Sequence, residues 1–472
     1  MKSASVKRNE LLDYIDADDI LIESAVNPRR IFRLNDCAVK KGKPIVYVMS
    51  REQRVNDNWG LLFAQNLALE NEAPLVVLLY FNSEEKIYSR HLHFMLQGAR
   101  DIELLLKEKN IPFYLVKKNR NDFCSFLNNF DLGALVVDFS PLDESSNLNS
   151  QFAKNVESAC FEVDSHNIIP ARFISNKQEF SAATLRPKVK VRLGEFLTQY
   201  PTLKKHPYSF EPGELTLNLD FSDVEDTSVT PVDWIKAGEK DALKHLKTFI
   251  DEKLDGYSEK RNDPTLNYSS NMSIYLKFGH ISSQRIALEI IKSDSPRGDK
   301  EAYLEELIVR KELADNFCLY NKDYKRFSAF NEWAQFTLNA HRKDIRSYEY
   351  SLLEFEKANT HDELWNAAQK ELVKTGKIHS YLRMYWCKKI LEWCKTPEFA
   401  LETAIYLNDK YALDGCEANG YTGIAWSIGG IHDRPWSERS VFGKIRYMNY
   451  QGCKRKFDVA SYIGRYKDYS IE

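Results

Sequence analysis

Two hydrophobic periodicities divide this chain of 472 residues. Between residues 44 and 164, short apolar runs rich in β-branched residues alternate with stretches whose apolar positions recur at helical spacing. The runs predict strands and the stretches predict helices. The predicted strands are 45–49, 75–81, 111–116, 134–139 and 161–164, and the predicted helices are 58–71, 91–109, 122–130 and 149–160. Strands that alternate with helices indicate a Rossmann-like α/β domain, in which helices cover both faces of a parallel sheet.

The strand pattern stops near residue 168, and only helical spacing follows after residue 232. The predicted helices there are 234–254, 280–291, 301–319, 331–341, 360–371, 380–393 and 397–406. Prolines and polar stretches interrupt the pattern between the two halves. We therefore predict four parts: an N-terminal extension (1–40) with at most one short helix, an α/β domain (41–168), a long interdomain linker (169–232) and an all-helical domain (233–472).

Composition is that of a globular protein, with 43% hydrophobic and 28% charged residues. The sequence has no apolar run long enough to cross a bilayer and no signal-peptide pattern, so we expect an intracellular protein without membrane contact. We also expect a monomer. It would lie in the cytoplasm or nucleoid of a prokaryote, or in the nucleus of a eukaryote. Eight cysteines form no C-x-x-C pair, and the histidines lack ligand spacing, so we expect neither a metal site nor a disulfide framework. The first predicted strand is not followed by G-x-G-x-x-G, the dinucleotide fingerprint.

A net charge of −2 hides a basic C-terminal segment. Residues 444–467 contain seven lysines and arginines against the single acidic residue Asp458, and aromatic residues lie between them. Such a segment can bind an anionic polymer such as nucleic acid. The alternative is an ordinary solvated surface.

Three tryptophans gather in the predicted helices of the second half: Trp365, Trp386 and Trp393. Trp386 and Trp393 are seven residues apart, which places them on one helix face about 10 Å from each other. Because indoles can pass single electrons, the cluster predicts a redox cofactor nearby. The alternative is that these large side chains simply fill a helical core.

Several blocks of sequence carry a family resemblance. They are VYVMSR (46–51), VDFSPL (137–142), RNDP (261–264), SSNMS (269–273), YLKFG (275–279), EELIVR (305–310), ADNFC (314–318), GIAWSIGG (423–430) and HDRPW (432–436). With these blocks the chain resembles the class II cyclobutane pyrimidine dimer photolyases of the photolyase and cryptochrome family, over about residues 44–468. The resemblance implies blue-light repair of pyrimidine dimers in DNA by electron transfer from reduced FAD, which splits the cyclobutane ring.

The same resemblance implies the cofactors and the residues that hold them. It implies a noncovalent FAD in the helical domain and an optional antenna chromophore, a deazaflavin or a folate, in the α/β domain. The residues that match the family's FAD-binding positions are Tyr257, Ser270, Asn271, Met272, Ser273, Arg383, Asn408 and Asp414. Arg383 and Asp414 match a salt bridge against the flavin, and Asn408 matches the residue that faces its reactive nitrogen. The chain departs from the common pattern at Ile274 and Lys277, where proline and histidine are frequent.

For the reaction, the resemblance implies an electron route through Trp386, Trp365 and then Trp393 towards the surface. Glu306 matches the carboxylate that hydrogen-bonds the dimer, in a pocket lined by Met384. The residues that match DNA or lesion contacts are Arg261, Asn262, Arg310, Trp426, Arg434, Trp436 and Arg446. Arg310 departs from members that have a tryptophan there, and its role is left open.

Two other functions compete with repair. A cryptochrome-like photoreceptor would keep FAD and the indoles but would not repair DNA; the lesion residues and the basic C-terminal segment favour repair instead. A flavin-free DNA-binding protein would not need Arg383, Asn408 and Asp414.

Overall fold

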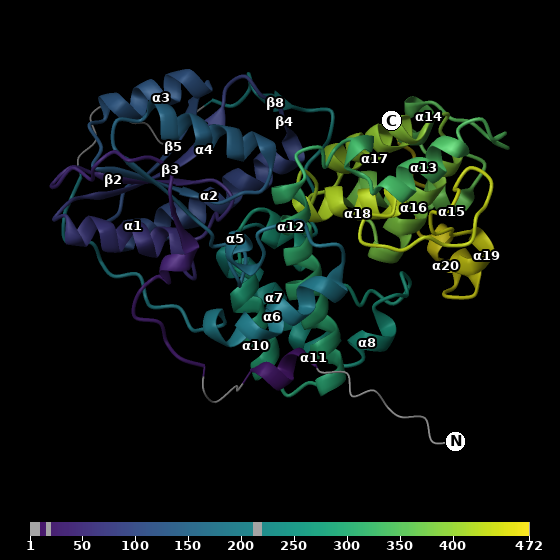
Figure 1. The fold of residues 1–472 in the computed structure, drawn as a ribbon, viewed down its shortest axis with the longest axis horizontal. Coiled ribbons are helices and arrows are strands. Elements are labelled where there is room, and N and C mark those ends of the chain that lie inside the picture. The colour runs from purple at the N-terminus through teal and green to yellow at the C-terminus, as the bar shows by residue number, and fades with distance from the viewer. Residues whose placement is uncertain (1–9, 16–19, 211–219, 472) are drawn as a thin grey trace.

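The computed structural model of the protein describes residues 10–15, 20–210 and 220–471. It joins an α/β domain to a helical half, and this confirms the predicted fold class. Figure 1 shows the sheet and its helices at the left, with the helical half extending through the centre to the right.

The main sheet has six strands in the order β1-β7-β6-β2-β3-β5. They are β1 (Ile31–Arg33), β2 (Ile45–Met49), β3 (Leu75–Asn82), β5 (Phe113–Lys118), β6 (Ala134–Asp138) and β7 (Ala159–Val163). All neighbouring pairs are parallel except β1 with β7. A small second sheet pairs β4 (Ile87–Tyr88) with β8 (Glu225–Asp226). The five predicted strands are confirmed, each within two residues of its predicted ends.

Helices cover both faces of the main sheet (Figure 1). They are α1 (Trp59–Glu70), α2 (Ser89–Glu108), α3 (Arg120–Asn129) and α4 (Asp143–Asn155). Along β2, Ile45, Tyr47 and Met49 pack in one core with α1 and α2, while Val46 and Val48 pack in another with α3 and α4. Because successive side chains point to opposite faces, a strand that is buried on both reads as a continuous apolar run.

The segment before residue 41 contributes more to the fold than the predicted extension. Besides the short helices η1 (Leu11–Tyr14) and η2 (Pro28–Arg30), it supplies β1, which pairs antiparallel with β7 at the edge of the sheet. Arg30 is buried and donates hydrogen bonds to the carbonyls of Asp164, Asn167 and Ile168. A three-residue strand is too short to show a period in the sequence.

The predicted linker likewise contains α5 (Ala171–Ile174) and the 15-residue helix α6 (Ala182–Phe196). Pro187 lies within α6, but Leu185, Val189 and Leu193 recur every four residues and pack into the core of the helical half. Pro187 had suggested an open connection here. The apolar side chains at helical spacing stabilise a helix in spite of it. The four-part division of the chain stays a prediction. It included neither β1 nor α6.

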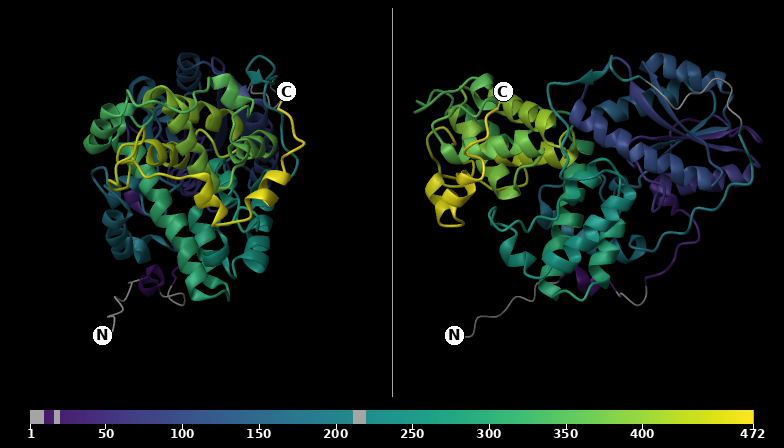
Figure 2. Two further views of the ribbon diagram at one scale, coloured as in Figure 1. Left: turned by 90° about the vertical axis from the view of Figure 1, so that its right-hand side faces the viewer. Right: turned by 180° about the vertical axis from the view of Figure 1, so that it is seen from behind.

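The helical half packs around two cores, one below the sheet in Figure 1 and one at the right. Its helices are α7 (Glu239–Lys253), α8 (Tyr257–Lys260), α9 (Met272–Lys277), α10 (Ser283–Lys292), α11 (Arg297–Leu304), α12 (Lys311–Tyr320), α13 (Glu332–Ala340), α14 (Leu352–Glu356), α15 (Glu363–Thr375), α16 (Ser380–Trp393), α17 (Pro397–Tyr411), α18 (Ala418–Gly429), α19 (Tyr450–Lys454) and α20 (Val459–Gly464), with a 3-10 turn η4 (Phe327–Ala329). Figure 2 shows from behind how α19 and α20 lie at the outer end of this half.

One predicted helix is divided. The expected helix 301–319 consists of α11 and α12 joined by a π-helical turn, η3 (Glu305–Arg310). In the part of the chain that the structure describes, we find no helix with both the length and the apolar character needed to span a bilayer.

A buried ion cluster joins the two halves. Arg51, just after β2, donates two hydrogen bonds of 2.9 Å to Asp315 on α12, and its Nη2 also donates to Glu417, which precedes α18. All three side chains are less than a tenth exposed. Burial acts to raise the pKa of Asp315, but the Arg51 guanidinium outweighs it and holds that pKa well below its usual value.

A second arginine ties α2 to the ends of two helices. Arg90 donates to the carbonyls of Val373 at 2.6 Å and Tyr411 at 2.6 Å, which are near the C-termini of α15 and α17. The last carbonyls of a helix lack intrahelical partners, so this arginine satisfies groups that would otherwise be buried without one. The sheet domain thus fixes the positions of α15 and α17.

We expect Arg51→Met to lower the free energy of unfolding by about 3–5 kcal/mol, because it leaves two buried carboxylates unpaired. Urea denaturation at pH 7 measures the loss. The control is Arg120→Met, which removes the exposed ion pair with Glu85 and should cost at most about 1 kcal/mol.

The loss of unfolding free energy in Arg51→Met should depend on pH. In the native protein the pKa of Asp315 is depressed, so its contribution to stability is present above its unfolded pKa of about 4 and is lost as the pH falls. Without Arg51, burial alone raises that pKa, and protonation then favours the folded variant. The stability gap between the two proteins should therefore narrow as the pH falls from 7 to 4. A gap that stays constant would contradict this account.

Candidate functional site

The three indoles of the second half lie in contact inside the helical core. Trp365 on α15 and Trp386 on α16 are parallel, with ring centroids 6.2 Å apart and an interplanar angle of 3°. Trp393 lies 6.1 Å from Trp365 at 68°. The contacts therefore run in the predicted order of Trp386, Trp365 and Trp393. Trp393 was expected towards the surface but is only 3% exposed.

Hydrogen bonds hold two of these rings in place. Trp365 Nε1 donates to the carbonyl of Trp386 at 3.1 Å, and Trp386 Nε1 donates to Gln369 Oε1 at 2.9 Å. A buried indole N–H without an acceptor would be costly. Gln369 lies one helical turn after Trp365, so its position on the same helix face was readable from the sequence, although its role was not predicted.

Arg383 and Asp414 form the predicted salt bridge at one end of the indole series. Arg383 Nη2 donates to Asp414 Oδ1 at 2.9 Å, and the Ser273 hydroxyl donates to Asp414 Oδ2 at 2.8 Å. Burial acts to raise the pKa of Asp414, but Arg383 and the Ser273 hydroxyl outweigh it, so the pKa lies below its usual value. The carboxylate thus stays ionised and orients the guanidinium.

Two buried polar atoms at this salt bridge have no hydrogen-bond partner among the described residues: Asn271 Oδ1 and Arg383 Nε. Buried polar atoms are normally paired, so unpaired atoms indicate a site for a polar ligand. Asn271 has a left-handed backbone (φ 57°) and immediately precedes α9. The residues present thus fit a ligand that offers both donors and acceptors, as FAD does.

Other predicted FAD residues surround the same region. Ser270 Oγ accepts from the Met272 N–H at 3.4 Å and from the Tyr303 hydroxyl at 3.2 Å. The ring of Tyr257 lies 5.2 Å from that of Tyr303.

Asn408 is buried on α17, and its Nδ2 donates to Asp409 Oδ1 at 3.0 Å. A Cβ on Gly420 would lie 3.0 Å from that nitrogen, so a side chain there would displace the amide. Asp409 also accepts from the Tyr421 hydroxyl at 2.9 Å, and burial raises its pKa. The predictions did not include Asp409, which orients Asn408.

Glu306 lies on the π-helical turn η3 and pairs with Arg261, whose Nη1 is 3.0 Å from Glu306 Oε1. The Glu306 side chain is 44% exposed in the protein without DNA. Arg310, at the end of the same turn, pairs with Glu305 at 3.3 Å. Turns of π-helix are rare and often occur at functional sites.

Met384 is half-buried on α16 and Asn262 is exposed. For neither residue does the structure show a polar contact that tests its predicted role.

The predicted DNA-contacting residues of the HDRPW region form a layered group. The Arg446 guanidinium lies 4.3 Å from the ring of Trp436 and 5.3 Å from that of Trp426, and Arg434 lies 5.2 Å from Trp436. Asp433 accepts from Arg446 Nε at 2.9 Å and from Trp436 Nε1 at 3.3 Å. Asp433, which was not predicted, thus holds the group together.

Among the described residues, one buried group could offer ligands to a metal ion. It consists of His166, Asp315 and Glu417, whose ligand atoms lie within 4.8 Å of one another. Arg51 already neutralises both carboxylates, so we interpret this group as part of the ion cluster between the two halves.

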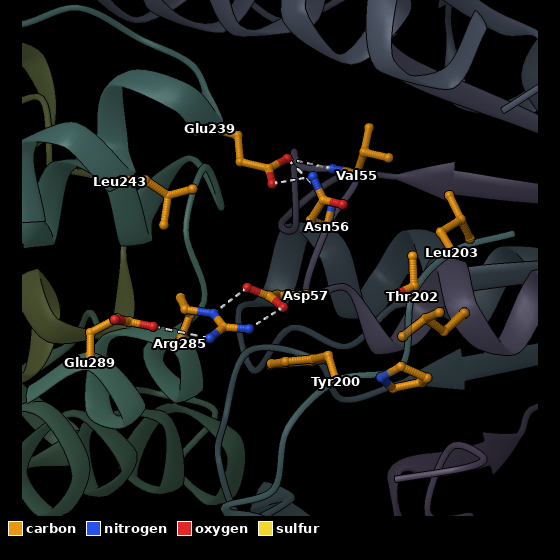
Figure 3. A pocket seen from close by; sticks show the side chains of 12 residues that line it. Val55, Asn56, Asp57, Tyr200, Thr202, Leu203, Glu239, Leu243, Arg285 and Glu289 are labelled. Carbon is orange, nitrogen blue, oxygen red and sulfur yellow. Dashed lines mark hydrogen bonds and ion pairs between the residues drawn. The ribbon is translucent and has the colours of Figure 1, made fainter. Parts of the chain in front are cut away.

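A cavity of about 410 Å³ lies between the α/β domain and the helical half. Figure 3 shows Arg285 directed at Asp57 and Glu289, with Tyr200 close to Asp57 and Leu203 at the opposite side of the cavity. The cavity includes residues 55–57, which follow β2. β2 lies between β3 and β6, where the strand order reverses, and ligands of α/β sheets bind at that point beyond the carboxyl ends of the strands.

Known proteins resemble this chain in sequence over most of its length. A family model described as DNA photolyase matches residues 45–207. Deoxyribodipyrimidine photo-lyases of Potorous tridactylus, Arabidopsis thaliana and Methanothermobacter thermautotrophicus are 44%, 42% and 40% identical to this chain. The matches cover 94%, 90% and 90% of this chain and 85%, 89% and 95% of those relatives.

Solved structures show the same fold. A Synechocystis sp. PCC6803 cryptochrome superposes with a TM-score of 0.70 and 14% identity, over 90% of this chain and 89% of that one. A bacterial class III photolyase from Agrobacterium tumefaciens gives a TM-score of 0.65 and 16% identity, over 91% and 87%. At these identities the likeness concerns the fold alone.

Proposed function

The chain belongs to the DNA photolyase family, and we propose on that premise that it is a deoxyribodipyrimidine photo-lyase, which uses blue light to split cyclobutane pyrimidine dimers in DNA. The observation that carries the proposal is that relatives from an animal, a plant and an archaeon bear this name and match nearly the whole chain. Membership of class II rests on the sequence blocks quoted above.

FAD is the cofactor that we propose for the helical half. When it is bound and reduced, it supplies under blue light the electron that enters the dimer. Arg383 and Asn408 would hold the ring, and Asn271 offers a polar atom that lacks a partner among the described residues. Tyr257, Ser270, Met272 and Ser273 would hold the remainder of the cofactor. The ionised Asp414 orients the Arg383 guanidinium towards this site.

The indole series offers a route for single electrons. Trp386 and Trp365 stack in parallel, and Trp393 contacts Trp365, so each transfer step would be between rings about 6 Å apart. Gln369 fixes the ring of Trp386.

The lesion would bind between residues of η3, α16 and α18. Glu306 and Arg261 can offer a carboxylate and a guanidinium to the dimer, while Met384 and Trp426 offer apolar faces. Trp436, Arg434, Arg446 and Arg310 would approach the duplex. Enzymes that act on a base in duplex DNA flip it out of the stack, at a cost of a few kcal/mol that is smallest for a damaged base; photolyases are among the enzymes for which this is described.

We also propose that the cavity beside Asp57 holds the antenna chromophore, a deazaflavin or a folate. Its volume of about 410 Å³ lies within the range of small-molecule sites, and it opens where the strand order reverses. Tyr200 offers an aromatic face and Arg285 a cation.

The cryptochrome-like photoreceptor is the alternative. It would share the FAD site and the indoles but would not need the pairing of Glu306 with Arg261. We further propose that the protein acts as a monomer inside the cell, where its DNA substrate lies.

Glu306→Ala should lower repair per absorbed photon about tenfold, because a hydrogen bond to a charged group contributes about 1.5–3 kcal/mol. FAD content and DNA affinity should stay close to those of the native protein. The measurement is recovery of intact thymines in an oligonucleotide with one thymine dimer under blue light, against a dark control. Glu398→Ala is the matched control, since Glu398 is also paired with an arginine and is 38% exposed. Near-native repair by Glu306→Ala would remove Glu306 from the mechanism.

Trp386→Phe should abolish light-driven reduction of the oxidised flavin and spare repair once the flavin has been reduced chemically. Absorption spectra during illumination follow the reduction. Trp234→Phe, which changes a 41% exposed indole, should behave like the native protein. Persistent photoreduction in Trp386→Phe would show that the electrons take another route.

Leu203→Trp should fill the cavity and weaken binding of an added deazaflavin or folate at least tenfold, with FAD content unchanged. Equilibrium fluorescence titration measures this affinity. The control is Leu353→Trp, at a 62% exposed position. Equal affinity in Leu203→Trp and the native protein would place the antenna elsewhere.

A further inference from the structure

A buried lysine extends the layered group of arginines and indoles into the protein. Lys388 Nζ lies 5.2 Å from the centroid of the Trp426 ring. Arg446 lies over both Trp426 and Trp436, so cations and indoles alternate from the solvent-exposed Trp436 down to Lys388. Lys388 is the only member of this series that is completely buried.

Lys388 contacts the last turn of α18 as well as the ring of Trp426. Its Nζ donates to the carbonyl of Ser427, the residue after Trp426. Lys388 also lies one helical turn after Met384 on α16, so the two residues share a helix face. The lysine therefore connects α16, which carries Trp386, Trp393 and Met384, to the indole of α18 that we place at the lesion.

The environment of Lys388 is an expensive one for a cation. Burial lowers the pKa of the lysine to about 7, against the opposing attraction of Asp433. An apolar side chain of similar length would avoid this cost, since replacing buried charges by well-packed apolar residues is often neutral or stabilising. A role in packing alone therefore does not account for a lysine at this position.

We infer that Lys388 is a positioning residue for lesion recognition, which fixes the ring of Trp426 at the depth and tilt that a flipped dimer requires. This inference rests on the proposed function. Arg446 is 39% exposed and pairs with Asp433 in a surface loop, so it can leave Trp426 to contact DNA. Lys388 would then be the remaining cation over that ring.

Lys388→Met tests the inference in the dark, where binding is measured without repair. The probes are a duplex oligonucleotide with one thymine dimer and the same duplex without damage. We expect the dissociation constant for the damaged duplex to rise about tenfold and that for the undamaged duplex to stay within twofold. The melting temperature should not fall, which separates positioning from support of the fold. If this variant does not fold, Lys388→Gln, which keeps a donor for Ser427, replaces it.

A double-mutant cycle shows whether Lys388 acts through Trp426. In a Trp426→Ala background, Lys388→Met should have no further effect on lesion affinity. An equal loss in both backgrounds, or no loss in the native background, would overturn the inference. Lys389→Met is the control, because Lys389 is the neighbouring lysine, is 9% exposed and pairs with Glu392.

The preference of the native protein for damaged DNA shows whether the proposed function or only the role of Lys388 has failed. If it does not prefer the damaged duplex, the proposed function fails. If it has that preference and Lys388→Met keeps it, only the role of Lys388 fails.

Discussion

The guanidinium of Arg51 is the contact on which the rest of the molecule depends. It leaves the sheet at the end of β2 and enters the helical half, where it bonds Asp315 in the middle of α12 and Glu417 at the start of α18. A buried charge needs partners in defined positions, so this cluster fixes two helices relative to the sheet. Those helices frame the candidate lesion site: η3 leads into α12, and Trp426 lies on α18. Arg90 does the same for α15 and α17, which carry Trp365 and Asn408.

A local irregularity in one helix affects the position of the candidate lesion-binding residues. The π-helical turn η3 interrupts what would otherwise be one helix from Arg297 to Tyr320. A wider turn shifts every side chain after it around the helix axis relative to those before it. Glu306, within this turn, pairs with Arg261, the residue that follows α8. Asp315, further along the helix, faces Arg51. One helix can thus serve the site at one end and the interdomain cluster at the other.

The sequence predicted those parts of the fold whose burial is periodic. The strand β2 is apolar throughout, and β3 and β6 are apolar up to their last residues, Asn82 and Asp138, because both faces of the sheet are covered. The turn η3 was read as ordinary helix, since its apolar residues continue the helical spacing. In the site, the indoles and the salt bridge of Arg383 with Asp414 were predicted from sequence and resemblance. Gln369, Asp409, Asp433 and Lys388 were not, because their partners depend on how helices pack and lysines usually indicate solvent.

The strand β1 has a consequence for solubility. The edge of a sheet presents unpaired backbone groups that can pair with another molecule, and natural proteins cover such edges. Here Ile31–Arg33 close the β7 edge, and Arg30 fastens them to the carbonyls that follow β7. A protein shortened to begin at residue 41 would keep the catalytic residues but expose β7 along its length. Such a fragment would tend to self-associate edge to edge, so β1 protects the sheet from aggregation.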